Sequence, residues 1–313
     1  MDYLDFNTMN MNKIPQIEFK EKKLMKKKSC VLCFSKKLRK VLNFKETPLA
    51  NSYKKSLNKK EQYFPLSCVL CKNCGHLQLS YLVNPKIMFE NYLYVSGTSK
   101  VLKEHFVDYA KKMISMFNLT SKSKILDIAC NDGTFLEYFK IKKFKNVVGV
   151  EPARNLRILN LKKKIDINTN FFSKKFSFEM KKKYNSFDLI TANNVFAHSP
   201  HLYDFSQGVK NILSKKGIFV FEVSYLSTVL NKKTFDTIYH EHMSYHALKP
   251  LVNFFKMQNL EIFDFQLIQA QGGSIRVFVS HKGSYKVKVN KINNQIKNVF
   301  IKGNGFFCGP SVD

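Results

Sequence analysis

Short apolar runs alternate with amphipathic helical stretches from residue 125 to residue 223, and this alternation restricts the possible folds more than any other feature. The apolar runs predict strands over residues 125–129, 146–150, 165–168, 187–192 and 217–223. The stretches between them predict helices over residues 134–139, 153–163 and 202–213. Strands and helices that alternate in this way form a parallel sheet with helices on both faces. We therefore predict an α/β, doubly wound sheet as the main body of the chain.

Further elements are predicted on both sides of this region. Residues 96–120 show a helical pattern, whose apolar residues are Val101, Phe106, Ala110, Met113 and Phe117. After the fifth strand we expect a helix over residues 248–258 and two closing strands over residues 261–268 and 274–280. The fifth strand is apolar except for Glu222, as expected of a strand that is buried on both faces.

The first predicted strand leads into a tight turn at residues 127–133, which is a candidate cofactor loop. Small residues at Ala129 and Gly133 let the backbone approach a ligand, and Glu151 can accept both hydrogen bonds from an adenosine ribose. The turn lacks the glycines of a dinucleotide fingerprint and a Walker lysine, so it favours S-adenosylmethionine (SAM) over NAD or ATP. The alternative is an ordinary strand-to-helix turn with Asp127 as a cap. The predicted cofactor-binding residues are Asp127, Ala129, Asn131, Gly133, Glu151 and Asn193.

Five of the seven cysteines fall in the first quarter of the chain, before the predicted sheet. Two pairs with two residues between their cysteines can point four thiolates at one ion and form a closed, structural zinc site. Cys68 forms another such pair with Cys71, but Gly75 favours the later pair because glycine suits the tight turn around the thiolates. Free buried cysteines are the alternative to a metal site. The predicted metal ligands are Cys30, Cys33, Cys71 and Cys74.

Ionisable and phenolic side chains gather where the fourth and fifth predicted strands end. Residues 237–242, with the sequence Thr-Ile-Tyr-His-Glu-His, follow the fifth strand, and His198 follows the fourth. Because the carboxyl ends of strands in an open α/β sheet face the ligand, we expect these side chains to share one cleft. The spacing is not that of an HExxH zinc site, so no second metal is predicted. The candidate catalytic residues are His242, Tyr239, Glu241 and His198.

The formal charge of +29 raises the question of nucleic-acid binding, but the kind of basic residue argues against it. Among the 52 basic residues, only Arg39, Arg154, Arg157 and Arg276 carry the planar fork that matches bases and phosphates. The lysines are spread along the whole chain, as an AT-rich coding sequence would produce. We expect no nucleic-acid partner, although the charge can help attract an anionic substrate.

No stretch of the sequence reaches the roughly 18 uncharged apolar residues that a membrane helix needs. The first residues, which include Asp2 and Asp5, lack the basic-then-apolar pattern of a secretory signal. We therefore expect a cytoplasmic protein with no membrane partner.

Several stretches, taken in order along residues 30–283, resemble the SAM-dependent C-methyltransferases that act on nucleotide-linked deoxysugars. Besides the two cysteine pairs, the matching stretches are residues 47–51, 75–79, 92–99, 127–133, 151–152, 194–198, 235–242 and 272–277. The resemblance implies a Rossmann-like class I methyltransferase sheet preceded by a small zinc-binding domain, with SAM and structural Zn²⁺ as cofactors. It also implies a zinc domain that helps hold the nucleotide-sugar substrate, and a base and substrate ligands at Tyr239, Glu241, His242 and His198.

The resemblance divides the chain into a polar lead-in at residues 1–29, a zinc-binding domain at 30–95 and a methyltransferase domain at 96–285. Members of this family usually carry a further C-terminal α/β domain. We expect residues 286–313 to be only its truncated start, and a partner chain is one source of the missing part.

These features lead to a hypothesis for the reaction. Methyl transfer to carbon needs a carbanion, and a sugar C–H bond is acidic only beside a ketone, as in a dTDP-linked keto-deoxysugar. We predict His242 as the base, oriented or tuned by Glu241, with Tyr239 and His198 donating hydrogen bonds to the enolate or the substrate. The alternatives are a nucleic-acid methyltransferase with a zinc ribbon and an inactive, truncated SAM-binding scaffold.

Overall fold

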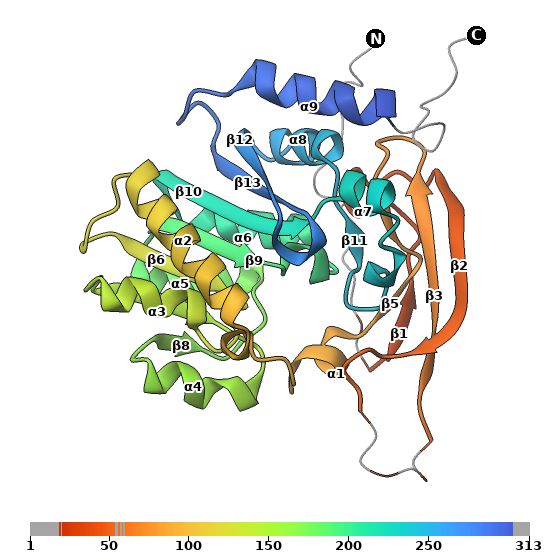
Figure 1. The fold of residues 1–313 in the computed structure, drawn as a ribbon, viewed down its shortest axis with the longest axis horizontal. Coiled ribbons are helices and arrows are strands. Elements are labelled where there is room, and N and C mark those ends of the chain that lie inside the picture. Colours follow the sequence, from red (N-terminus) through yellow and green to blue (C-terminus); the bar gives the residue numbers. More distant parts are fainter. Residues whose placement is uncertain (1–18, 20, 54–55, 57, 59, 303–313) are drawn as a thin grey trace.

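The computed structural model describes residues 19, 21–53, 56, 58 and 60–302, with side chains described as far as residue 297. In this part of the chain a seven-stranded sheet lies beside a smaller, four-stranded sheet (Figure 1). Residues 1–18 of the predicted lead-in and residues 303–313 of the C-terminal stretch lie outside the described residues.

The large sheet has the strand order β12-β13-β10-β9-β6-β7-β8. Its strands are β6 (Lys124–Ile128), β7 (Asn146–Val150), β8 (Asp166–Asn168), β9 (Phe187–Asn193), β10 (Leu213–Ser224), β12 (Leu260–Ile268) and β13 (Ser274–His281). The five strands from β6 to β10 run parallel to one another. The chain starts at β6 in the middle, proceeds outward to β8 and then returns to β9 on the other side of β6. This reversal creates a crevice at the carboxyl ends of β6 and β9, where open α/β sheets bind their ligands.

One strand of the large sheet runs against its neighbours. β13 pairs antiparallel with both β10 and β12. A short turn joins β12 to β13, and in it Gln271 and Gly272 have φ angles of 52° and 79°. A parallel neighbour would need a crossover connection of about a dozen residues or more. The five strands predicted from the alternation are parallel, and the closing strand β13, for which no direction was predicted, makes the sheet mixed.

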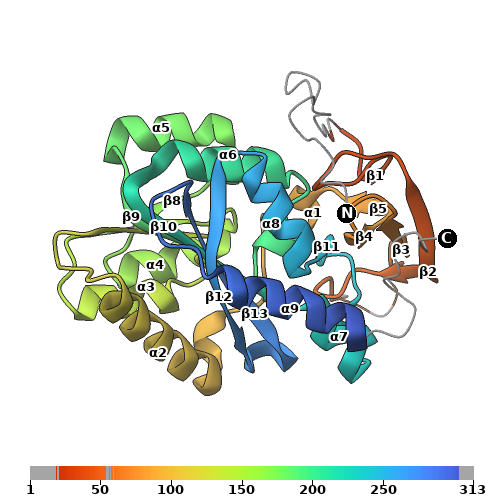
Figure 2. The same cartoon turned by 90° about the horizontal axis from the view of Figure 1, so that it is seen from above.

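Helices cover both faces of the large sheet (Figure 2), which confirms the predicted doubly wound α/β fold. One face packs against α2 and α3, and the other against α5, α6 and α8. Neighbouring residues of β6 divide between the faces: Ile125 packs on the α2 side and Leu126 on the α6 side. The helices are α1 (Pro85–Phe89), α2 (Lys100–Met116), α3 (Thr134–Ile141), α4 (Arg157–Lys162), α5 (Lys174–Tyr184), α6 (Leu202–Ile212), α7 (Leu226–Lys232), α8 (Leu248–Lys256) and α9 (Val289–Lys302).

Some helices differ from the sequence prediction. Neither α5 nor α7 was expected. In α5, five lysines obscure the helical spacing of the buried residues Phe176 and Met180. Residues 153–163 were expected to form one helix, but a short 3-10 turn precedes α4. On α2, Val101 is 78% exposed, and the buried face begins at Leu102 instead.

The small sheet has the order β11-β4-β3-β2, and every neighbouring pair in it is antiparallel. Its strands are β2 (Leu38–Pro48), β3 (Tyr63–Cys71), β4 (Leu77–Leu79) and β11 (Ser244–Tyr245), and a separate ladder joins β1 (Leu24–Lys26) to β5 (Tyr81–Val83). β1 lies in the stretch predicted to be a polar lead-in, so pairing begins earlier than expected. β11 comes from the second half of the chain: it follows β10 and α7 in sequence but pairs with β4 of the small sheet.

None of the helices in the described ranges is both long and apolar enough to cross a membrane.

Candidate active site and metal centre

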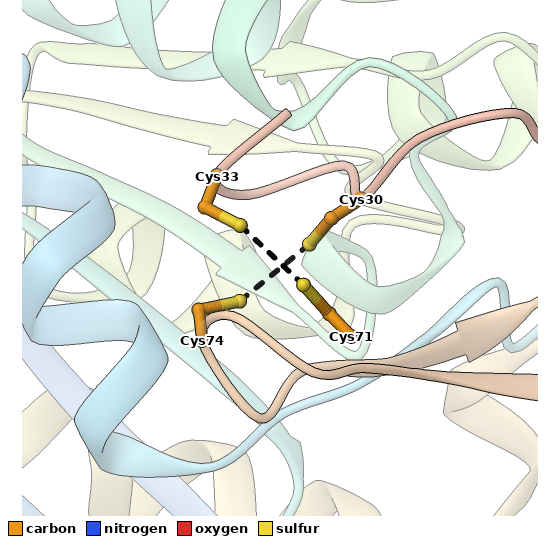
Figure 3. Close-up of side chains that lie close together, drawn as sticks. All are labelled: Cys30, Cys33, Cys71 and Cys74. Carbon is orange, nitrogen blue, oxygen red and sulfur yellow. Dashed lines mark hydrogen bonds between the residues drawn. The ribbon is translucent and has the colours of Figure 1, made fainter. Parts of the chain in front are cut away.

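The four cysteines predicted as metal ligands lie together between two turns of the chain (Figure 3). Their sulfur atoms all lie within 4.8 Å of one another. The Sγ atoms are 3.6 Å apart for Cys30 and Cys74, and 3.5 Å apart for Cys33 and Cys71. Thiolates at about 2.3 Å from a tetrahedral zinc ion would be about 3.8 Å from each other. The cluster therefore fits a closed structural Zn²⁺ site.

Cys68, the alternative ligand, lies outside this cluster. It is fully buried in the apolar core of the small sheet, where burial raises the pKa of its thiol to about 12. Side chains alternate between the faces of a strand, so Cys68 and Cys71, three positions apart on β3, point to opposite sides. Gly75 closes the turn with a φ of 76°, and its backbone N–H donates to the carbonyl of Cys71 at 2.9 Å.

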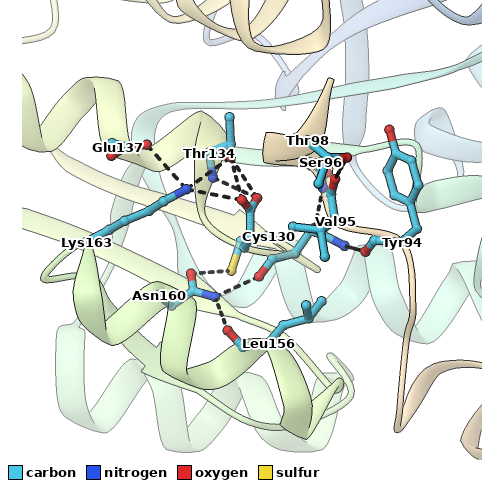
Figure 4. Close-up of polar contacts among 12 residues, drawn as sticks. Tyr94, Val95, Ser96, Thr98, Cys130, Thr134, Glu137, Leu156, Asn160 and Lys163 are labelled. Atoms are coloured by element: carbon cyan, nitrogen blue, oxygen red, sulfur yellow. Dashed lines mark hydrogen bonds and ion pairs between the residues drawn. The ribbon is translucent and has the colours of Figure 1, made fainter. Parts of the chain in front are cut away.

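The turn after β6 has the backbone of a ligand-binding loop. Ala129, Asn131 and Gly133 adopt φ angles of 53°, 54° and 76°, in the left-handed region. Asn131 is held at two points, because its Oδ1 accepts from the N–H of Ser96 and its carbonyl accepts from Nδ2 of Asn160. Figure 4 shows Ser96 and Asn160 among the polar contacts around this loop. A Cβ atom at Gly133 would lie 2.5 Å from Oδ1 of Asn160, so the loop requires glycine there.

Asp127 is the second-last residue of β6, at the centre of the crevice. Its Oδ1 accepts hydrogen bonds from Oγ1 of Thr191 at 2.6 Å and from Nδ2 of Asn193 at 3.3 Å. Burial raises the pKa of Asp127 to about 7. Oδ1 of Asn193 is buried and has no hydrogen-bond partner among the described residues, so it is available to a ligand donor.

Glu151 follows β7 on the same edge of the sheet. Its carboxylate accepts from the backbone N–H groups of Asn131 and Ala153, both at 2.8 Å. Burial outweighs these two donors and raises the pKa of Glu151 to about 7. A carboxylate at this position can accept hydrogen bonds from the hydroxyls of an adenosine ribose. The residues around Asp127 and Glu151 thus fit SAM.

A single cavity of about 1020 Å³ extends from these carboxylates to the polar segment after β10. Five of the six predicted cofactor residues line it, whereas Gly133 lies outside the lining and shapes the turn. The candidate catalytic residues that line it are His198, Tyr239 and His242. Aromatic walls come from Phe19, Phe89, Phe106, Phe171, Phe172 and Phe205. The cavity lies at the upper end of the size range of small-molecule sites, so it can hold SAM and a second substrate.

His242 is held in one tautomer. Its Nδ1 lies 2.7 Å from the carbonyl oxygen of Thr237, and its Nε2 lies 3.1 Å from Oη of Tyr239. A carbonyl oxygen can only accept, so Nδ1 carries the proton and Nε2 keeps its lone pair, to which Tyr239 donates. Burial lowers the pKa of His242, which keeps the ring neutral near pH 7. A neutral imidazole with a free lone pair on Nε2, in a residue that lines the cavity, can act as a base once Tyr239 turns away.

His198 lies beside this pair. Its ring stacks on Phe89 with 5.6 Å between centroids and lies 5.1 Å from the ring of His242. Burial, and then the nearby His242, lower the pKa of His198. Its Nε2 is buried and finds no partner in the described part of the chain. An unpaired buried nitrogen at a cavity wall is suited to a hydrogen bond with substrate.

Glu241 makes different contacts from those expected. It was predicted to orient His242, but its carboxylate accepts from Nδ2 of Asn51 at 2.6 Å and from Oη of Tyr92 at 2.9 Å. The carbonyl of Thr237 orients His242 instead. Glu241 itself is not among the described residues that line the cavity, so it supports the wall through Asn51 and Tyr92, which do line it.

Asn51 and Tyr92 were missing from the predicted site. Both lie in stretches, residues 47–51 and 92–99, that contributed to the family resemblance. Their roles could not be derived from the sequence, because they depend on a contact with Glu241 across 190 and 149 positions of the chain. The resemblance was the only available signal for them.

Comparison with known proteins agrees with this geometry. Residues 30–89 match the family described as "Putative zinc binding domain", and residues 102–264, about half of the chain, match the family described as "Methyltransferase domain". The C-methyltransferase NovU of Streptomyces niveus is 30% identical over 242 residues, which cover 77% of this chain and 57% of that protein. This chain therefore spans little more than half the length of that relative.

Two solved structures are also similar. A SAM-dependent methyltransferase from Clostridium acetobutylicum has 17% identity and a TM-score of 0.44, covering 58% of this chain and 92% of its own. Another from Anabaena variabilis has 15% identity and a TM-score of 0.46, covering 61% of this chain and 88% of its own.

The doubly wound sheet, with its reversal at β6 and the carboxylates beside it, is that of a class I methyltransferase. The chain belongs to the SAM-dependent methyltransferases in which a zinc-binding domain precedes the methyltransferase domain.

Proposed function

We propose that this chain is a C-methyltransferase that methylates the carbon next to the ketone of a nucleotide-linked keto-deoxysugar, with dTDP as the expected nucleotide. The observation that carries the proposal is the tautomer of His242: its Nδ1 is bonded to the carbonyl of Thr237, and its unprotonated Nε2 accepts from Tyr239. His242 and Tyr239 both line the cavity that also contains Asp127 and Glu151. The similarity to a protein named as a C-methyltransferase supports the same reaction class. In this proposal residues 30–95 form the zinc-binding domain and residues 96–285 the methyltransferase domain.

SAM supplies an electrophilic methyl group when it is bound. Glu151 would accept hydrogen bonds from its ribose, and Asn193 and Asp127 would accept from its amino-acid end. The left-handed backbone at Ala129 and Asn131 lets the loop approach the cofactor without a side chain in between. The carboxylates of Asp127 and Glu151 accept hydrogen bonds best when they are ionised. Because burial raises their pKa values and so favours the protonated forms, SAM binding would release protons.

In the proposed reaction, Nε2 of His242 takes a proton from the carbon next to the ketone. The electron pair of that C–H bond forms the enolate, whose oxygen accepts hydrogen bonds from Tyr239 and His198. The enolate carbon would then form a bond to the methyl group of SAM while the methyl–sulfur bond breaks and its electron pair leaves with sulfur as S-adenosylhomocysteine. The ketone would be restored, and His242 would release its proton to water. Before substrate binds, Tyr239 donates to Nε2 of His242, and it must turn towards the enolate oxygen to free the base.

The nucleotide end of the substrate would lie towards the outer part of the cavity. Lys86, an exposed residue at the start of α1, is the one lysine or arginine among the described lining residues. Its ammonium would pair with the diphosphate, and the aromatic walls would contact the base and the sugar rings. The small sheet contributes Asn51 to the same cavity, in keeping with a zinc-binding domain that helps hold the substrate.

The direct test is to incubate zinc-loaded protein with SAM and a dTDP-4-keto-6-deoxysugar and to follow the sugar nucleotide by mass spectrometry. We expect a product heavier by one methyl group, formed together with S-adenosylhomocysteine. The His242→Ala protein should form none. SAM binding without any product, over a set of nucleotide-linked keto sugars, would overturn the proposed substrate class, and methylation of added RNA or DNA would replace it with the nucleic-acid alternative.

A further inference from the structure

The catalytic segment, residues 237–246, is bonded to the small sheet at several points, and its last residue, His246, also bridges to Tyr225 after β10. Nε2 of His240 lies 3.2 Å from the carbonyl of Phe64 on β3, and the N–H of Leu79 donates to the carbonyl of Met243 at 3.0 Å. Directly after Met243, the chain forms β11 and becomes the edge strand of the small sheet beside β4 (Figure 2). His242 is thus only two residues from a strand of the zinc-bearing sheet.

Gln78 lies where the metal centre and the catalytic segment meet. Its backbone belongs to β4, where it is the register partner of Ser244 on β11. Its side chain bonds the first cysteine turn: Oε1 accepts from the N–H of Val31 at 2.8 Å, and Nε2 donates to the carbonyl of Ser29 at 3.1 Å. These two residues flank Cys30. Gln78 is 1% exposed, so the loss of either bond would leave a buried polar group without its partner.

The second cysteine turn is linked to the same strand. β3 and β4 form the hairpin whose turn carries Cys71 and Cys74, and the N–H of Cys71 donates to the carbonyl of His76 at 2.9 Å. The fully buried ring of His76 has its Nε2 3.3 Å from Oγ of Ser244 on β11. Both cysteine turns therefore contact β11 through β4 and the residue before it.

We propose that Gln78 is a positioning residue that couples the zinc centre to His242. The four thiolates join the two cysteine turns, Gln78 ties the first turn to β4, and β4 holds β11 and the catalytic segment. The zinc ion would then stabilise the geometry of the catalytic half of the cavity, in addition to the fold of the small sheet. The catalytic consequence rests on the proposed function, whereas the structural coupling does not.

The coupling predicts a specific pattern of order. Without zinc, or without the side-chain bonds of Gln78, β11 loses its partner strand and the amides of residues 243–246 open more often. β6 and β9, which hold the SAM loop, make no pairing with the small sheet and should stay protected. SAM affinity should therefore change less than the turnover rate.

The test uses Gln78→Met, which keeps the side-chain volume and removes both bonds. Gln258→Met is the matched control, because Gln258 is 2% exposed and its side chain also bonds two partners, but in the turn after α8. We expect hydrogen–deuterium exchange of residues 243–246 to become at least about tenfold faster in Gln78→Met, and unchanged in the control. Equal exchange in Gln78→Met and unmodified protein, or equal acceleration in both variants, would overturn the proposal.

A second measurement does not depend on the variant. Zinc is removed from the unmodified protein with a chelator, and the residual metal is measured. We expect hydrogen–deuterium exchange to become faster at residues 243–246 but not in β6 and β9. Undiminished protection of residues 243–246 in metal-free protein would overturn the coupling.

In methyl-transfer assays, Gln78→Met should lower kcat about tenfold while the SAM Kd stays within about twofold. If the unmodified protein transfers no methyl group, the proposed function fails, but the exchange experiments still decide the coupling.

Discussion

The two halves of the cavity are built in different ways. The SAM half comes from adjacent strand ends of one sheet, and its central contact, between Asn131 and Glu151, spans 20 positions of sequence. The catalytic half joins two sheets, and Glu241 meets Tyr92 and Asn51 across 149 and 190 positions. Sheet topology therefore determines the first half, whereas the second depends on how the zinc-bearing sheet packs. Substitutions in one half of the cavity should therefore change its function while leaving the other half unaffected.

The largest expected effect lies in the catalytic half. Replacement of His242 by Ala removes the base, and general-base catalysis is worth roughly 10²- to 10⁴-fold in rate. We expect kcat to fall within that range while the SAM Kd, measured by calorimetry, stays unchanged. His281→Ala is a suitable control, because His281 lies on β13 and bonds the carbonyl of Leu213. Turnover near the unmodified rate in His242→Ala would show that another group is the base.

A substitution in the SAM half should change the SAM Kd more than kcat. Glu151→Ala removes a buried charged acceptor, and a hydrogen bond to a charged group contributes about 1.5–3 kcal/mol. The SAM Kd should rise by roughly tenfold to a hundredfold, with a smaller change of kcat at saturating SAM. Exchange protection of residues 243–246 should be unaffected. A Kd equal to that of the unmodified protein would remove Glu151 from the cofactor site.

The same carboxylates predict opposite pH dependences for stability and for SAM affinity. Asp127 and Glu151 have folded-state pKa values of about 7, raised by burial from ordinary values of 3.8 and 4.5. Between the ordinary and the raised pKa values, the folded chain binds more protons than the unfolded chain. The contribution of these two carboxyl groups to the stability of SAM-free protein is therefore lost as the pH rises from about 4 to 7.

SAM affinity should instead increase as the pH rises from 6 to 8, by up to about tenfold for each carboxylate that must ionise. Thermal melts with and without SAM over this range test both trends. The D127N variant is the control for one carboxylate, because it does not titrate. A SAM Kd that is independent of pH would show that neither carboxylate contacts the cofactor in its ionised form.

The smallest effect is expected at the outer part of the cavity. Lys86→Ala should raise the KM for the nucleotide sugar severalfold without a change in kcat, since an exposed ion pair contributes only about 0.2–1 kcal/mol. The effect should shrink at high salt, and Lys86→Arg should retain most of the affinity. A lowered kcat at saturating substrate would place Lys86 nearer to the reacting atoms than we propose.

The sequence predicted those parts of the molecule that depend on local patterns. Strand–helix alternation indicated the sheet, and spacing identified the four cysteines, because each pair lies within a single turn. It did not predict that β13 runs antiparallel, since an apolar strand has the same pattern in either direction. The lysine-rich α5 was missed for a related reason, because its apolar face has only a few residues.

The sequence brought His198, Tyr239 and His242 to the same cavity as the SAM-half residues, but it did not predict the contacts that support the catalytic half. The turn after β6 and Glu151 follow from strand ends, whereas Asn51, Tyr92 and Gln78 act through partners far along the chain. The role of Glu241 was assigned wrongly for the same reason: neighbours in sequence on an irregular segment need not touch. Its side chain contacts Asn51 and Tyr92, while the adjacent His242 contacts Thr237 and Tyr239.

The most direct measurement follows the methyl group itself. Protein would be incubated with the dTDP-4-keto-6-deoxysugar and SAM labelled with carbon-13 in its methyl group, and the product analysed by NMR. We expect the labelled methyl carbon to be bonded to the sugar carbon next to the ketone, in unmodified protein but not in His242→Ala. A labelled methyl group on oxygen or nitrogen of the product, or equal labelling by His242→Ala, would contradict enolate methylation by this site.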